Sequence, residues 1–129
     1  MRRIALLTLL ALAACRSEPD VELAHVNAAK EFTQRYSRSR LGPWKVRASA
    51  AGADCAVLLV HAGIMLDDST VDALHHGTGA YDVYAGGVEQ FSKHRQFRAV
   101  AYQDASGRIL WPTGAHRTAD PLAPCDSRR

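Results

Sequence analysis

The sequence lacks the residue spacings that most often mark a metal, nucleotide or redox site. Six histidines and three cysteines are present, but there is no His-x-x-x-His pair, no Cys-x-x-Cys pair and no Gly-Lys-Ser/Thr loop. The neighbours His75 and His76 would point about 100° apart on a helix, which makes a shared ion difficult. A metal site would need distant histidines such as His61, His75 and His94 to meet in the fold. We predict no metal and no cofactor.

The chain also lacks an apolar run long enough to span a membrane. The run 4–12 falls well short of the roughly 20 residues that a transmembrane helix needs. It follows a basic start at Arg2 and Arg3 and precedes the small residues Ala13 and Ala14, which is the layout of a cleavable secretion signal. We therefore predict export and no retained transmembrane helix.

The end of this signal, Leu12-Ala13-Ala14-Cys15, resembles the lipobox of bacterial lipoproteins. The resemblance implies cleavage before Cys15, a diacylglyceryl group on its thiol and, in many such bacteria, a third acyl chain such as palmitate. Two or more chains are enough for stable anchoring. Arg16, in place of Asp, implies the outer membrane rather than the inner one, on the periplasmic side of the cell envelope. The alternative is an ordinary cleaved signal that happens to precede a cysteine.

The charge is nearly balanced once the predicted signal is removed. Loss of Arg2 and Arg3 lowers the basic count from 16 to 14, against 13 acids, in a mature chain of 115 residues. Its net charge is then about +1 instead of +3, so we predict no nucleic-acid partner. A chain of this length can bury one compact core.

The cysteines divide into one that the lipid occupies and one pair. With Cys15 lipidated, Cys55 and Cys125 remain as an even pair in an oxidising compartment. We predict that they form a disulfide that closes a loop of about 70 residues and ties the C-terminal tail to the domain. The alternative is a buried free Cys55 with Cys125 exposed on the tail.

The first half of the mature chain predicts a long helix followed by two strands. The helix ends at Gly42-Pro43, and spacings of three and four residues place six side chains on one face: Val21, His25, Ala28, Ala29, Phe32 and Tyr36. Residues 44–50 alternate as in a half-buried strand, and 51–54 suit a turn. Residues 55–62 are apolar on both faces, which predicts a central strand covered on both sides.

The second half predicts shorter elements. Asp67, Asp68 and Ser69 suit the start of a helix that Gly77 closes. The other expected elements are a short strand at 81–84, a helical turn or two at 88–95, and a hairpin of 97–103 with 108–111.

These elements add up to a small single α+β domain, in which a long N-terminal helix packs on a mostly antiparallel sheet of about four strands. We expect four regions: a cleaved signal peptide at 1–14, a lipidated tether at 15–20, the α+β domain at 21–111 and an irregular tail at 112–129.

One dipeptide suggests an enzyme. Asp54-Cys55 resembles the start of the Asp-Cys-Ser-Gly motif of NlpC/P60 cysteine peptidases, although Ala56 and Val57 replace the last two residues. The resemblance would make Cys55 a nucleophile, with one of three later histidines as its base: His75, His76 or His94. We predict that the chain is not an enzyme and keep a cell-wall peptidase as the weaker alternative.

A glycine-framed segment is the predicted contact surface. Tyr81, Asp82 and Tyr84 lie between two glycine pairs, as aromatic anchors do on recognition loops. The alternative is that the two tyrosines pack on the sheet while the glycines form turns.

We expect an accessory protein of the bacterial cell envelope that is anchored to the membrane by lipid and acts through contacts with a protein partner. An inhibitor or immunity protein against a periplasmic hydrolase is the alternative. The sequence leaves the oligomeric state open.

Overall fold

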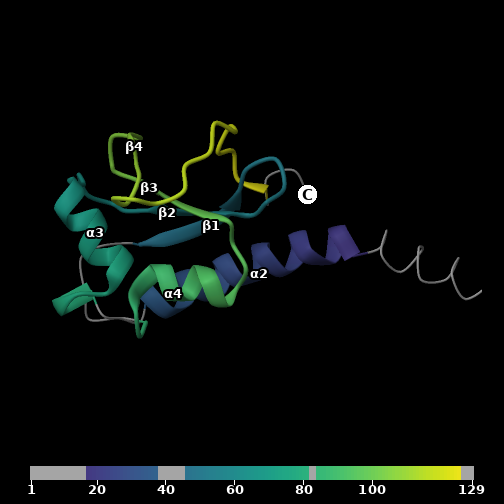
Figure 1. Cartoon of the computed structure of the whole chain (residues 1–129), viewed down its shortest axis with the longest axis horizontal. Helices are drawn as coiled ribbons and strands as arrows, with labels where there is room; N and C mark the ends of the chain where they lie inside the picture. Colours follow the sequence, from purple (N-terminus) through teal and green to yellow (C-terminus); the bar gives the residue numbers. More distant parts are fainter. Residues whose placement is uncertain (1–16, 38–45, 82–83, 126–129) are drawn as a thin grey trace, which may run out of the picture.

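The computed structural model describes residues 17–37, 46–81 and 84–125 (Figure 1). The predicted signal peptide, Cys15 and the expected stop at Gly42-Pro43 lie outside these ranges. No helix within them is both long enough and apolar enough to cross a membrane.

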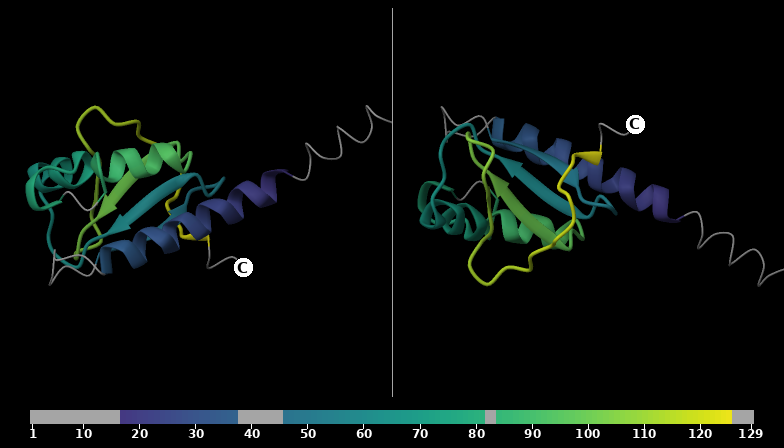
Figure 2. Two further views of the ribbon diagram at one scale, coloured as in Figure 1. Left: turned by 90° about the horizontal axis from the view of Figure 1, so that it is seen from below. Right: turned by 90° about the horizontal axis from the view of Figure 1, so that it is seen from above.

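The longest element is helix α2, Ser17–Ser37, which packs along β1 (Arg47–Ala51). Five of the six side chains predicted to share its apolar face are buried: His25, Ala28, Ala29, Phe32 and Tyr36. The sixth prediction is wrong, because the Val21 side chain is 49% exposed. A helix of 21 residues is about 31 Å long and a five-residue strand about 17 Å, so the first turns of α2 extend past the sheet (Figures 1 and 2).

The sheet has four strands in the order β1, β2 (Val57–His61), β3 (Ala99–Gln103) and β4 (Ile109–Leu110). This confirms the predicted fold class, a single α+β domain with a long N-terminal helix on a four-stranded sheet. The pairs β1–β2 and β3–β4 are antiparallel, whereas the central pair β2–β3 is parallel, which makes the sheet mixed.

The parallel pair needs a crossover connection, which the chain supplies as three helical pieces. They are α3 (Asp68–His76), the 3-10 turn η1 (Gly79–Tyr81) and α4 (Gly87–His94). The predicted caps of the first piece are present: Asp67 accepts a hydrogen bond from the Thr70 backbone, and Gly77 is left-handed. The predicted strand at 81–84 is wrong at its start, because the backbone N–H of Tyr81 closes a turn on Thr78.

Strand β2 lies at the centre of the core and is buried on both faces, as predicted. Leu58 and Val60 pack against the helices, while Val57 and Leu59 pack on the opposite face. That second face is covered by the segment that follows β4, through residues that include Trp111 and Leu122.

Two glycines fix how α3 meets α4. A Cβ atom added to Gly77 would lie 2.6 Å from the backbone nitrogen of Gly87, and one added to Gly87 would collide with the His75 carbonyl. Both residues also have positive φ, 69° and 73°. Only glycine allows this backbone approach at this conformation, so the end of α3 is held directly against the start of α4.

The segment that follows β4 has little regular structure as far as Cys125, and it is attached to the domain at Pro124 and Cys125. Pro124 forms an isolated antiparallel bridge with Ala51, and Cys125 lies at disulfide distance from Cys55, with the Cα atoms 5.8 Å apart. Both cysteines are buried. The predicted pairing of Cys55 with Cys125 therefore agrees with the fold.

Replacing Cys125 by Ser should lower the free energy of unfolding. The bridge spans 70 residues, and in the loop-entropy treatment its loss costs about 4 kcal/mol. Urea unfolding of the wild type with and without reductant, beside Cys125→Ser, measures the change. Equal midpoints for the three samples, or two reactive thiols in denatured unreduced protein, would rule out the bridge.

Candidate functional site

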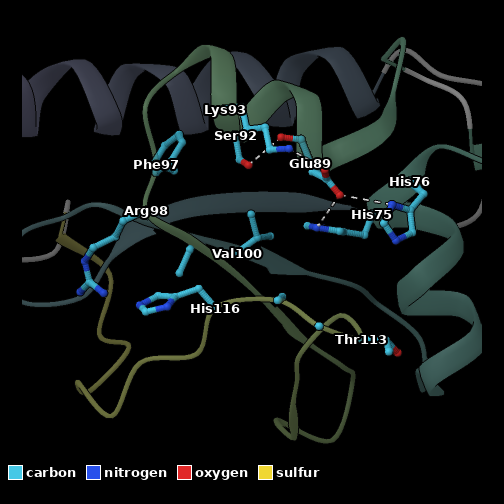
Figure 3. A pocket seen from close by; sticks show the side chains of 13 residues that line it. His75, His76, Glu89, Ser92, Lys93, Phe97, Arg98, Val100, Thr113 and His116 are labelled. Atoms are coloured by element: carbon cyan, nitrogen blue, oxygen red, sulfur yellow. Dashed lines mark hydrogen bonds and ion pairs between the residues drawn. The ribbon is translucent and has the colours of Figure 1, made fainter.

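A groove of about 330 Å³ runs beside the start of β3, between α4 and the segment 113–116 (Figure 3). Its floor includes Phe97, Val100 and Ala115, so it is apolar at the centre. Charged and titratable side chains surround this floor: His75, His76, Glu89, Lys93, Arg98 and His116.

Glu89 is the hub of the polar wall. Its Oε1 accepts a hydrogen bond from the Lys93 ammonium at 2.7 Å, while its Oε2 lies 3.2 Å from His76 Nδ1 and 3.4 Å from His75 Nε2. The Lys93 hydrogen bond is the main cause that lowers the pKa of the Glu89 carboxyl. Glu89 is therefore ionised at neutral pH and holds three donors in one place.

His75 connects this hub to the core. Its Nδ1 lies 3.0 Å from the hydroxyl of Tyr102, whose side chain is fully buried. The Glu89 carboxylate can only accept, so Nε2 of neutral His75 carries the proton and Nδ1 accepts from the Tyr102 hydroxyl. Burial lowers the pKa of His75 and raises that of Tyr102 well above its usual value. Both side chains are thus neutral at pH 7.

The floor of the groove contains an open sheet edge. Strand β4 pairs only with Tyr102 and Gln103 of β3, and the buried Pro112 follows it soon after. On this side of β3, Ala99–Ala101 therefore has no neighbouring strand within the described residues. The backbone carbonyl of Gln103 points to the β2 side, where it accepts a hydrogen bond from the backbone N–H of Ala62. Because successive residues of a strand alternate, Val100 directs its backbone N–H and C=O toward the groove.

Polar contacts at both ends hold the opposite wall in place. Asp72 on α3 accepts hydrogen bonds from the backbone and hydroxyl of Thr113, at 3.0 and 2.9 Å. Farther along, Arg98 binds Asp54 at 2.9 Å and Asp120 at 2.7 Å. The Arg98 hydrogen bond lowers the pKa of Asp54, so this pairing persists at neutral pH. The groove is therefore formed before any ligand arrives.

The tyrosines predicted to contact a partner lie elsewhere. Tyr81 and Tyr84 are half-buried against the main core, and neither lines the groove. The Tyr84 hydroxyl is 2.6 Å from His94 Nδ1, and Arg35 lies over its ring at 4.9 Å. Packing accounts for both side chains, and their partner-binding role stays a prediction. Asp82 lies outside the described residues.

The residues named for the peptidase alternative are placed as follows. Cys55 is buried and paired with Cys125, so in this state it has no free thiolate to act as a nucleophile. His75 and His76 contact Glu89, whereas His94 contacts Tyr84. Across 17–37, 46–81 and 84–125, no group of three or more His, Cys, Asp or Glu is arranged to hold a metal ion.

Most of the residues that line the groove show no pattern in the sequence that predicts their meeting. The pairing of Glu89 with Lys93 could have been predicted, because an acid and a base four residues apart share a helix face. Nothing local indicates that His75 and His76 would meet Glu89, or that Arg98 and His116 would face the same hollow. The contact between Gly77 and Gly87 brings His75 and His76 to Glu89.

The pH dependence of stability tests the buried histidine. Because burial lowers the pKa of His75, the folded chain binds this proton less readily than the unfolded chain, whose histidine titrates near 6.5. The free energy of unfolding of the wild type should therefore fall as the pH drops from 7 to 5. That of the His75→Gln variant should fall less steeply over the same range. The control is His116→Gln, an exposed histidine on the other wall. Equal slopes for wild type and His75→Gln would contradict this assignment.

No family model, no curated protein and no solved structure matches this chain.

Proposed function

We propose that the chain is anchored by lipid at Cys15 to the periplasmic side of the bacterial cell envelope, on the outer membrane, and that its domain acts by binding a protein partner. The observation that carries the binding role is the open edge of β3 at the floor of a preformed groove. An accessory subunit of an envelope assembly fits this role.

The edge suits an extended segment of the partner. A strand laid beside β3 would exchange hydrogen bonds with the backbone of Val100, which is how many domains recognise peptides. The apolar floor at Phe97 and Ala115 would receive a side chain of that segment. Glu89 and the groups that it holds would contact polar atoms at one end. Specificity would come from these side chains, while the backbone contacts would be common to any sequence.

The anchor would position the domain close to the membrane. Only Arg16 separates Cys15 from α2, which starts at Ser17. The first turns of α2 project past the sheet, so they would hold the sheet away from the lipid surface (Figure 2). The groove lies on the flank of the domain, between α4 and the C-terminal segment, and would stay open to a partner.

The inhibitor alternative uses the same groove and differs in its target. An inhibitor would form a tight, stoichiometric complex with a periplasmic hydrolase and suppress its activity. An accessory subunit would instead co-purify with a membrane assembly and leave hydrolase activity unchanged. The weaker peptidase alternative requires a free Cys55, which the pairing with Cys125 opposes.

Replacing Cys15 by Ser tests the anchor. We expect the variant to lose incorporation of labelled palmitate and to leave the membrane fraction, because its hydroxyl cannot form the thioether. Cys125→Ser is the control for loss of a cysteine and should keep the label, because its Cys15 thiol remains available for lipid. Full labelling of Cys15→Ser would refute the lipid anchor.

Filling the groove tests the binding role. Ala115 lines the groove, whereas Ala119 is exposed on the same segment and does not. Chemical crosslinking of the membrane-anchored protein, followed by mass spectrometry, should identify one partner in the wild type and in Ala119→Trp. Ala115→Trp should lose that crosslink while its unfolding midpoint stays unchanged. An equal yield from both variants would show that the partner binds elsewhere.

A further inference from the structure

A second hollow, of about 560 Å³, lies at the end of the sheet where β2 and β3 both finish. The two strands are parallel neighbours, so their carboxyl ends meet at one edge. The loops that follow them stay in contact, because the Ala105 N–H donates to the Ile64 carbonyl at 2.9 Å. In open α/β sheets, ligands commonly bind outside the carboxyl ends of parallel strands. Its lining includes Gly107 and the polar side chains of Arg47, His61 and Gln103. None of these residues belongs to the groove beside α4.

Three of the polar side chains form one row across the sheet. Arg47 on β1 pairs in register with His61 on β2, which pairs with Gln103 on β3. Residues in register point to the same face and lie about 5 Å apart at Cβ. His61 Nδ1 is 2.6 Å from Gln103 Oε1, and the Gln103 amide nitrogen donates to the Gly107 carbonyl at 3.4 Å. The row is therefore fixed in part before any ligand binds.

Asp104, the acidic residue of this hollow, already has hydrogen-bond partners within the domain. The Asp104 side chain is fully buried and accepts hydrogen bonds from the backbone and hydroxyl of Ser106, and from Arg108. These contacts lower the pKa of Asp104, and the hydrogen bond from the Ser106 side chain is the largest cause. The negative charge of Asp104 is therefore buried instead of facing solvent. Arg47 is exposed, and no acid among the described residues pairs with it. The hollow thus presents a positive charge to solvent.

We propose that the row Arg47–His61–Gln103 binds a carboxylate from an acidic segment of a protein partner. The guanidinium of Arg47 matches a carboxylate in shape and can bind both of its oxygens. One full positive charge balances the single negative charge of a carboxylate, whereas a phosphate group would keep an excess of negative charge. His61 and Gln103 would border the same carboxylate.

The location suits a contact with the periplasm. The carboxyl ends of β2 and β3 lie at the opposite end of the sheet from the first turn of α2 (Figures 1 and 2). The hollow would therefore face away from the membrane, a point that rests on the proposed anchor at Cys15. The carboxylate site itself depends neither on that anchor nor on the groove.

Titration of the mature protein in neutral detergent with fluorescein-labelled hexaglutamate tests the site. Fluorescence anisotropy at low salt should show saturable binding that hexaglutamine does not reproduce. Arg47→Gln should weaken it by about tenfold or more, because a charged hydrogen-bond donor is lost. The matched control, Arg117→Gln, removes another exposed arginine and should change the affinity by less than about twofold. Amide shifts in NMR spectra should centre on Arg47, His61 and Gln103.

Three results would overturn the proposal. The first is no saturable binding, and the second is equal weakening by Arg47→Gln and Arg117→Gln. The third is displacement of the peptide by inorganic phosphate at lower concentration than by acetate, which would assign the hollow to phosphate. Because the probe is a free peptide, each result is independent of the crosslinking experiment with Ala115→Trp.

Discussion

Burial of β2 on both faces is the constraint on which the rest of the structure depends. Leu58 and Val60 require a helical layer on one side, and Val57 and Leu59 require a cover on the other. Within the described residues, the segment after β4 covers that second face, and it contains little regular structure. The pairing of Cys55 with Cys125 and the bridge from Pro124 to Ala51 hold this segment in place and compensate for its irregularity.

The crossover from β2 to β3 places the polar groups of the groove. Gly77 and Gly87 let the backbones of α3 and α4 touch, and this contact brings His75 and His76 to Glu89. A larger residue at either glycine would separate the carboxylate from its donors. Gly77 and Gly87, two of the glycines that frame Tyr81 and Tyr84, therefore form a close joint between the helices, while Tyr84 packs beside it on Phe91.

Two separate surfaces follow from the same sheet. The early end of β4 leaves the edge of β3 at Val100 open, and the proposed partner segment would lie there. A hollow lies at Gln103, where the parallel strands β2 and β3 end, and the proposed carboxylate would bind in it. One surface offers backbone hydrogen bonds and the other offers charge. A single partner could engage both only if it followed β3 from its edge to its end.

The sequence by itself determined the features that rest on local spacing: the apolar face of α2, the two-faced burial of β2, and the caps of α3 at Asp67 and Gly77. The even number of cysteines apart from Cys15 also predicted that Cys55 would meet Cys125. Local patterns failed for the other contacts between residues that are distant in the chain. The exposure of Val21 depends on where the sheet ends beneath α2, and the parallel pairing of β2 with β3 depends on how the crossover folds back. The meeting of His75 with Glu89, and of Arg47 with His61 and Gln103, was decided by tertiary structure alone, because packing and strand register bring these side chains together and no local pattern encodes either.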